Sequence, residues 1–225
     1  GGLLERSVTL VSGSAGIGKT TLGLQFIVEG ARQGEPGLIV ALEEAPAQIL
    51  KTAEGLGLPL REATESGLVE IMYLSSEYVR ASQFLTLLDD KIRAQKTRRL
   101  VLDSVSHMAR NGSEAFRQLL YAMVVRFKSS GVTSILTLEA DSLYSTDTVT
   151  ERGYSPVADN IFLLRYAREA QRMVPTIAVV KTRGSSHDWS VHDFSTGQGG
   201  ISIGTRADGD DRPPRAQLAV PLTKR

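Results

Sequence analysis

The stretch Gly13-Ser14-Ala15-Gly16-Ile17-Gly18-Lys19-Thr20 has the spacing G-x-x-x-x-G-K-S/T of a phosphate-binding P-loop. It follows the β-branched run 7–11, which is typical of a short buried strand, and residues 20–32 have the pattern of a helix. Glycines allow the loop to turn its N–H groups toward an anion, and a helix N-terminus adds a positive dipole. We therefore expect nucleotide phosphates to bind here, in preference to an ordinary Gly-rich turn before a helix.

The motif also assigns roles to individual side chains. Lys19 is expected to reach the β- and γ-phosphates, and the hydroxyl of Thr20 is expected to ligate Mg²⁺. ATP and Mg²⁺ are thus the expected cofactors. The residues expected to surround the nucleotide are Ser14, Ala15, Gly16, Ile17, Gly18, Lys19, Thr20 and Thr21.

Apolar runs alternate with amphipathic segments through the first 140 residues, and the pattern then changes. Residues 160–166 and 176–182 are two apolar runs separated by the charged segment 167–173, which is typical of adjacent strands and a hairpin turn. This order predicts an α/β fold, with a mainly parallel sheet flanked by helices and an antiparallel C-terminal extension. The other expected strands are 38–42, 68–73, 99–104, 132–139, 191–194 and 200–203, and helices are expected from Pro46 and over 82–95 and 114–129.

The composition is that of an ordinary globular chain of 225 residues with a formal net charge of +1. This balance provides no overall basic field for nucleic acid or an acidic membrane, and no apolar run is long enough to span a bilayer. The lack of cysteine excludes a disulfide framework and fits a cytoplasmic protein. We expect one domain over residues 1–204 and a flexible tail or linker over 205–225. Because the chain opens almost on its first strand, we also expect a domain excised from a longer protein.

Three carboxylates follow apolar runs at positions that suit a phosphate site. Asp103 ends one run, which favours a role beside Mg²⁺ over that of a helix N-cap. Glu43 and Glu44 follow another run and are placed to activate a water molecule in line with the γ-phosphate, although a solvated helix start also explains them. Because ligands bind at the carboxyl ends of parallel strands, we expect these carboxylates and the P-loop at one edge of the sheet.

A third polar constellation is the segment Lys181-Thr182-Arg183-Gly184-Ser185-Ser186-His187-Asp188, which follows an apolar run. Cations in such a position can neutralise a transferring phosphoryl group, as an arginine finger does, in their own subunit or in a neighbouring one. The spacing alone supports a surface turn with two basic residues equally well.

Five segments in this order together resemble KaiC, the family of circadian-clock ATPases within the RecA-like P-loop ATPases. The resemblance covers about residues 1 to 204, and an ordered set of motifs makes it specific. The segments are residues 13–21, Ala41-Leu42-Glu43-Glu44-Ala45-Pro46, Val101-Leu102-Asp103-Ser104, Ala158-Asp159-Asn160-Ile161-Phe162-Leu163-Leu164-Arg165 and the basic segment 181–188.

The resemblance implies a RecA-like core with ATP bound between the subunits of a homo-oligomeric ring, usually a hexamer. Family proteins commonly carry two such domains in tandem, so a second domain and signalling partners are expected. Glu43 and Glu44 match the family's catalytic glutamate pair. The resemblance places Lys181, Arg183, Ser185 and His187 at the nucleotide of the neighbouring subunit. The expected catalytic set consists of Lys19, Glu43, Glu44 and Arg183.

The chain departs from the family where some members autophosphorylate an adjacent Ser-Thr pair, because the corresponding positions here are Ser155 and Pro156. Proline cannot accept phosphate, so we expect ATP hydrolysis to dominate, with Ser155 as a single candidate acceptor for autokinase activity.

Two alternatives remain open: a recombinase-like DNA-binding ATPase and a nucleotide-gated scaffold with negligible turnover. The predicted loop 141–157 carries only one cation, Arg152, which disfavours nucleic acid as a partner.

Overall fold

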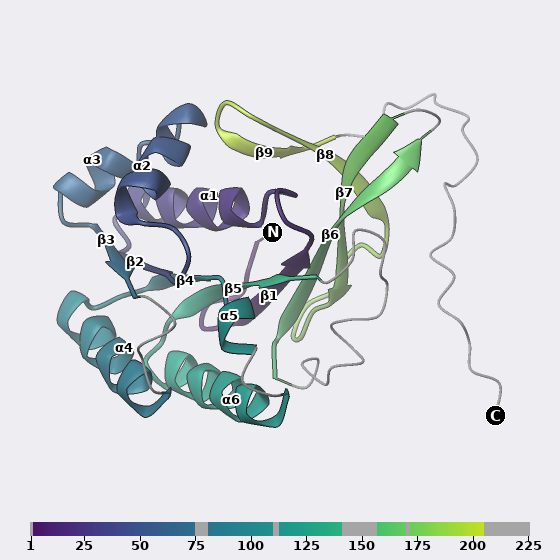
Figure 1. The fold of residues 1–225 in the computed structure, drawn as a ribbon. Helices are drawn as coiled ribbons and strands as arrows, with labels where there is room; N and C mark the ends of the chain where they lie inside the picture. The colour runs from purple at the N-terminus through teal and green to yellow at the C-terminus, as the bar shows by residue number, and fades with distance from the viewer. Residues whose placement is uncertain (1, 75–80, 110–112, 141–156, 170–171, 205–225) are drawn as a thin grey trace, which may run out of the picture.

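The computed structural model describes residues 2–74, 81–109, 113–140, 157–169 and 172–204. Within them the chain forms a nine-stranded sheet in the order β3-β2-β4-β5-β1-β6-β7-β8-β9 (Figure 1). Neighbouring strands are parallel from β3 to β6 and antiparallel from β6 to β9, which confirms the predicted sheet. The strands are β1 (Val8–Gly13), β2 (Gly37–Ala41), β3 (Val69–Tyr73), β4 (Arg99–Asp103), β5 (Thr133–Glu139), β6 (Asn160–Glu169), β7 (Arg172–Lys181), β8 (Val191–Gly197) and β9 (Gly200–Ile203).

Helices cover both faces of the parallel part of the sheet, because its strands are apolar on both sides. Helices α1, α2 and α3 lie on one face, and α4 and α6 lie on the other (Figure 1). Side chains alternate along a strand, so Leu10 packs toward α6 whereas Val11 packs toward α1. The helices are α1 (Lys19–Arg32), α2 (Pro46–Gly55), α3 (Leu60–Glu65), α4 (Ala81–Gln95), α5 (Ser106–Ala109) and α6 (Ser113–Ser129).

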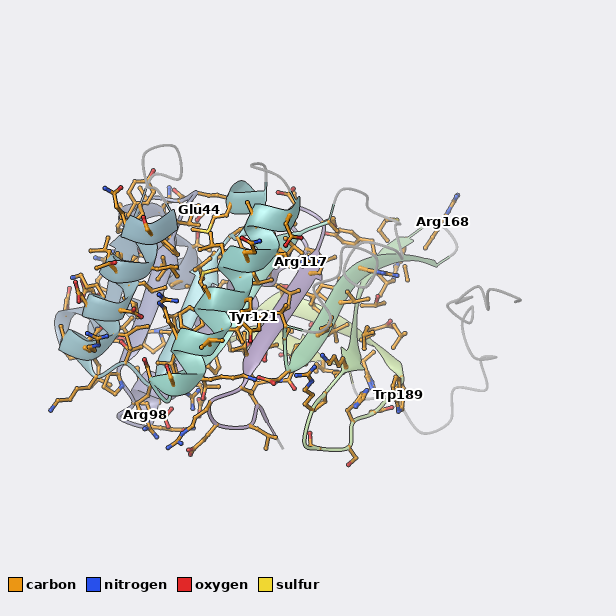
Figure 2. All side chains as sticks on the ribbon, turned by 90° about the horizontal axis from the view of Figure 1, so that it is seen from below. Glu44, Arg98, Arg117, Tyr121, Arg168 and Trp189 are labelled. Atoms are coloured by element: carbon orange, nitrogen blue, oxygen red, sulfur yellow. The ribbon has the colours of Figure 1, made fainter. Side chains whose placement is uncertain are left out.

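The two C-terminal runs form an antiparallel pair, as the sequence predicts, but their strands are longer than predicted and extend into the segment 167–173, where the turn is expected. Strand β6 continues to Glu169 and β7 begins at Arg172, so most of the charged segment is paired strand. This end of the ribbon is exposed, and Arg168 projects from it into solvent (Figure 2). Cross-strand backbone hydrogen bonds hold such a ribbon without an apolar face. The charge of the segment therefore reflects its exposure to solvent.

The sequence pattern does not predict α3 or α5, because helices of six and four residues contain too little periodicity to be recognised. Leu60, the first residue of α3, is fully buried and anchors this helix after Pro59, its N-cap residue. The predicted tail 205–225 lies outside the described residues, as does the predicted loop 141–157 apart from Val157, so nothing is seen of Ser155. No helix in the described part of the chain has the length and apolar character needed to cross a membrane.

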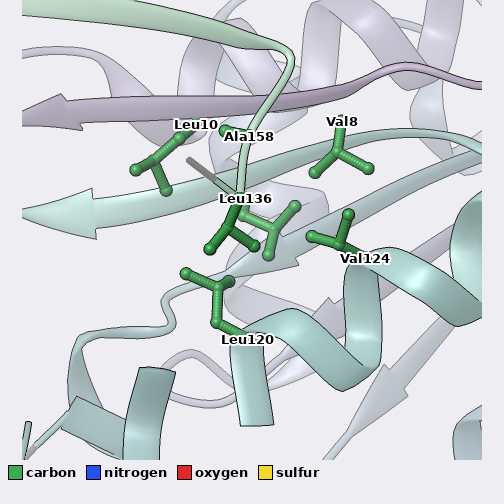
Figure 3. A pocket seen from close by; sticks show the side chains of 7 residues that line it. Val8, Leu10, Leu120, Val124, Leu136 and Ala158 are labelled. Atoms are coloured by element: carbon green, nitrogen blue, oxygen red, sulfur yellow. The ribbon is translucent and has the colours of Figure 1, made fainter. Parts of the chain in front are cut away.

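A small gap between α6 and the sheet is lined by apolar side chains, among them Leu10, Leu120 and Val124 (Figure 3). It has no room for a water molecule. A phosphate group needs hydrogen-bond donors around it, and this gap offers none. The gap is therefore part of the packed core, and the polar groups at the edges of the sheet are the candidates for a functional site.

The Gly13→Ala substitution should destabilise the domain, because Gly13 packs against β6 with no space for a side chain. A Cβ atom there would lie 2.7 Å from the Leu164 carbonyl oxygen and 2.8 Å from Ile17 Cγ2. Overpacking of this kind costs about 1–3 kcal/mol, which lowers the melting temperature by several degrees. The matched control is Gly55→Ala at the end of α2, where nothing lies within 4 Å of the added Cβ. Equal melting temperatures for the two variants would contradict this account.

Candidate functional site

The P-loop joins β1 to α1 and has the backbone conformation of an anion-binding loop. Gly16 and Gly18 have φ values of 73° and 112°, in the left-handed region that residues with side chains disfavour. Gly18 is the N-cap of α1, and the first turn of this helix has no side-chain cap and no acidic residue. Helix α1 therefore offers its first N–H groups to an external acceptor.

Lys19 is the first residue of α1 and is buried beside the loop. Its Nζ donates to the carbonyl oxygens of Gly13 at 2.9 Å and Ser14 at 2.7 Å. Burial lowers the pKa of Lys19, and nearby carboxylates, of which Glu139 is the strongest, oppose this shift. A phosphate would oppose it further, because a negative charge stabilises the ammonium form. The loop thus holds a cation whose surroundings favour an added anion.

Thr20 and Asp103, the pair expected at a metal ion, lie in direct contact. Thr20 Oγ1 donates to Asp103 Oδ2 at 2.6 Å, and Thr137 of β5 donates to the other carboxylate oxygen. The described residues contain no group of three His, Cys, Asp or Glu side chains that could hold a metal ion. Such a sparse donor set fits Mg²⁺, which keeps several waters and shares one or two protein oxygens with substrate phosphates. Ser14 Oγ is buried without a hydrogen-bond partner in the described chain, so it too can serve a ligand.

Glu43 and Glu44 lie at the same edge, just beyond β2. This edge is continuous with Asp103, because Leu42 N donates to the Asp103 carbonyl oxygen at 2.9 Å. Glu44 is exposed as a residue, but its carboxyl is partly desolvated, and this raises its pKa; the negative charges of Asp103 and Glu43 raise it further. Three carboxylates therefore influence one another beside the P-loop, in the arrangement that the sequence predicts.

Three further polar residues at this edge escape the sequence prediction: Thr137, Ser106 and Glu139. Thr137 holds Asp103, Ser106 Oγ accepts from Glu139 N at 2.6 Å, and Glu139 is the strongest negative neighbour of Lys19. Glu139 ends β5 as Asp103 ends β4, so the same reasoning about strand ends finds it once it is applied to β5. No signal in the sequence singles out Ser106.

Lys181 and Arg183 do not lie at the P-loop of the same chain. Val8, the first residue of β1, donates its N–H to the Asp159 carboxylate, and the Asp159 carbonyl oxygen accepts from Arg183 N at 3.1 Å. The P-loop starts at Gly13, the other end of this six-residue strand, which is about 17 Å away at the usual rise per residue. The cations and the P-loop therefore occupy opposite edges of the sheet.

Lys181 belongs to a cluster of positive charge at this second edge. Its Nζ donates to the Ala158 carbonyl oxygen at 2.7 Å. Burial lowers the pKa of Lys181, the positive charge of Arg183 and, less strongly, that of Lys128 lower it further, and Asp159 opposes them. An added anion would relieve this repulsion. The cluster is thus suited to a negatively charged partner.

Ser185 and His187 lie in the loop between β7 and β8, beyond Arg183 and away from the P-loop. Ser185 is exposed, whereas His187 Nε2 is buried and has no hydrogen-bond partner among the described residues. The His187 ring lies against the indole of Trp189, with a centroid distance of 4.3 Å. Glu44 and Trp189 lie at opposite ends of the molecule in Figure 2. The structure therefore divides the predicted site residues into two groups.

The hairpin of β8 and β9 packs on α1 behind the P-loop. Ile201 N donates to Gln25 Oε1 at 2.9 Å, and Gln25 Nε2 donates back to the Ile201 carbonyl oxygen at 3.3 Å. Phe194 and Ile201 are buried there, and both lie near Gly18. The sequence predicts the two strands but not this contact, because Gln25 has the pattern of an ordinary polar helix position.

The fold and the site together define a class of protein, the RecA-like P-loop ATPases. A family model described as "ATPase: KaiC" matches residues 1–208. The chain belongs to this KaiC ATPase family, which confirms the resemblance seen in the sequence.

Curated relatives agree with this assignment. The chain is 31% identical over 204 residues to the circadian clock oscillator proteins KaiC of Picosynechococcus sp. and of Rippkaea orientalis. It is 32% identical over 204 residues to the protein of the same name from Thermosynechococcus vestitus. These alignments cover 90% of this chain but only 39–40% of each relative. The chain thus spans about two fifths of the length of the relatives that it matches.

Proposed function

We propose that this chain is an Mg²⁺-dependent ATPase whose site is completed by an adjoining copy of the same chain. The observation that carries the proposal is the separation of the site into two halves. The P-loop and Asp103 lie at one edge of the sheet, whereas Lys181 and Arg183 lie at the other. A copy docked edge to edge brings its cations to the neighbour's phosphates, and repeated contacts of this kind close into a ring, here a hexamer.

One half of the site binds the phosphates. The P-loop amides and the Lys19 ammonium hold the β- and γ-phosphates. Thr20 and Asp103 hold the magnesium ion, which supplies positive charge to the phosphate oxygens when it is bound. The hydrogen bond between Thr20 and Asp103 already places both oxygens together at the helix start. The remaining residues that we assign to the nucleotide are Ser14, Ala15, Gly16, Ile17, Gly18 and Thr21.

The other half comes from the loop after β7 of the adjoining copy. Arg183 and Lys181 stabilise the charge that develops on the transferred phosphoryl group. Ser185 and His187, in the same loop, line the nucleotide beside them. The repulsion between Lys181 and Arg183 supports this role, because an arriving phosphate neutralises it.

Glu43 takes the proton from the attacking water as general base, and the Glu44 carboxylate beside it helps to hold this water in line with the γ-phosphate. Because the pKa of Glu44 is raised, its carboxylate form is populated only at a higher pH than that of an ordinary glutamate. The fall in turnover on the acid side of the pH–rate profile should therefore follow the protonation of Glu44.

The Glu43→Gln/Glu44→Gln double variant should bind ATP normally but lose turnover by about 100- to 10,000-fold, because it keeps the phosphate-binding groups and lacks the base. Calorimetry gives the affinity, and phosphate release gives the turnover. Glu65→Gln, an exposed glutamate at the end of α3, is the matched control. Unchanged phosphate release in the double variant would show that neither Glu43 nor Glu44 is the general base.

The pH profile adds a second readout to the same experiment. Turnover of the native chain should rise with pH as Glu44 loses its proton, above the pH at which ordinary glutamates do so. The Glu44→Gln variant should be slow and insensitive to pH over that range. If the Glu44→Gln variant shows the same fall in turnover at low pH as the native chain, that fall is caused by another group. A native chain that binds ATP and releases no phosphate would be a nucleotide-gated scaffold instead.

The relatives are named circadian clock oscillator proteins. We propose a signalling role for this ATPase as well, in the cytoplasm, through changes in the ring as ATP is turned over, and together with a second tandem domain and signalling partners. Autophosphorylation of Ser155 is a secondary activity in this proposal. Intact-mass measurement after incubation with ATP tests it directly, since one phosphate on Ser155 is the expected product.

A further inference from the structure

Trp189 is the single tryptophan of the chain, and 76% of its surface is exposed. Large aromatic side chains are usually buried or engaged with a partner, because water solvates an indole poorly. Trp189 lies just before β8, at the edge of the sheet opposite Glu44 (Figure 2). This is the edge at which the proposed function places the neighbouring copy's nucleotide.

The loop holds Trp189 firmly in its exposed position. The ring of His187 lies against the indole at 4.3 Å between centroids, inclined by 43°. The Asp188 carboxylate accepts from Ser190 N at 2.8 Å and lies 2.9 Å from His192 Nε2, which closes a tight turn around Trp189. An aromatic ring fixed in this way loses little conformational freedom when a ligand stacks on it.

The groups in this loop match the two chemical parts of a nucleoside triphosphate. Lys181 and Arg183 provide positive charge for the anionic tail, and Trp189 provides a flat aromatic surface for the base. We propose that Trp189 stacks on the purine base of the ATP bound in the adjoining copy, while Arg183 meets the phosphates of the same molecule. This inference rests on the proposed function, since it requires ATP at the junction of two copies.

The intrinsic fluorescence of the native chain tests the inference directly, because all tryptophan emission comes from Trp189. ATP with Mg²⁺ should quench this emission, since stacking on a purine quenches an indole. Inorganic tripolyphosphate with Mg²⁺ should bind without quenching, because it has the phosphates and lacks the base. Equal quenching by the two ligands would overturn the proposal, since the indole would then be reporting assembly alone.

Substitutions separate stacking from packing between copies. Trp189→Ala should weaken ATP binding by about 10-fold and leave tripolyphosphate binding unchanged, whereas Trp189→Phe should retain most of the affinity for ATP. Tyr121→Ala is the matched control, because Tyr121 is an aromatic residue with 62% of its surface exposed on α6 (Figure 2). Equal weakening of both ligands in Trp189→Ala would overturn the base contact.

A mixture of two variants shows whether Trp189 contacts the ATP of its own copy or that of the adjoining copy. Lys19→Ala copies keep Trp189 and have a disabled P-loop, whereas Trp189→Phe copies have an intact P-loop and no indole. Quenching by ATP in the mixture, but not in Lys19→Ala alone, means that Trp189 stacks on the ATP bound in the adjoining copy. Absence of quenching in the mixture, with ATP bound according to calorimetry, overturns the inference and leaves the ATPase intact. A native chain that binds neither ATP nor tripolyphosphate overturns the proposed function itself.

Discussion

Lys19→Ala should abolish detectable ATP binding and bring phosphate release down to background. The Lys19 ammonium is buried beside the loop, where it is bonded to the carbonyl oxygens of Gly13 and Ser14. A hydrogen bond to a charged group is worth about 1.5–3 kcal/mol, and in the proposed site the ammonium meets two phosphates. The affinity for ATP should therefore fall by at least about 100-fold in calorimetric titrations.

The control for this variant is Lys51→Ala, which removes an exposed lysine on α2 and should bind ATP as the native chain does. The melting temperature without nucleotide separates lost binding from lost folding. Tight ATP binding by a folded Lys19→Ala protein would mean that the nucleotide sits somewhere other than the P-loop.

Arg183→Ala should lower turnover by about 1,000-fold, the lower end of the range for a lost arginine finger. The effect should fall on turnover more than on binding, because Arg183 lies away from the P-loop of the same chain and, in the proposed site, acts on charge that develops in the transition state. Phosphate release at saturating ATP measures it. Arg172→Ala, an exposed arginine at the start of β7, is the matched control and should retain full turnover.

Mixing variants tests whether the site is shared. In an equal mixture of Arg183→Ala and Lys19→Ala copies, an intact P-loop can receive Arg183 from a Lys19→Ala neighbour. Random assembly makes about one quarter of the sites complete, so turnover should recover to about that fraction. If Lys19→Ala copies fail to assemble, the Glu43→Gln/Glu44→Gln variant, which should still bind ATP, replaces them as donor. No recovery with either donor would show that Arg183 does not act across an interface.

The P-loop and its position at the end of β1 could be predicted from the sequence because local chemistry determines the motif. A P-loop needs glycines, a lysine and a hydroxyl residue at fixed spacing, so Gly16, Gly18, Lys19 and Thr20 can be recognised without knowledge of the fold. Asp103 follows from one further rule, that ligands bind where parallel strands end. The same rule finds Glu139, whose effect on Lys19 appears only when β5 and β1 are seen to be neighbours.

The second edge could not be predicted from spacing, because a basic turn such as Lys181 to Arg183 has the same pattern whether it binds phosphate or only solvent. Here the family resemblance supplied a role, and the sheet supplied the position. The Gln25 contact with β9 and the helix α3 depend on packing between segments far apart in the chain. Such contacts leave no periodic signal. The full length of β6 and β7 cannot be predicted either, because the charge at their exposed ends resembles that of a turn.

A catalytic pocket divided between opposite edges of one sheet, as proposed for this chain, would have a consequence for stoichiometry. An open row of copies always ends in one pocket that lacks its cations and one set of cations that meets no pocket. A dimer joined in this way would have one working site for two chains, and a closed ring alone uses every site. Activity per chain should therefore increase with each added copy and reach its maximum when the ring closes. The specific activity of this protein would then also measure how many copies are joined.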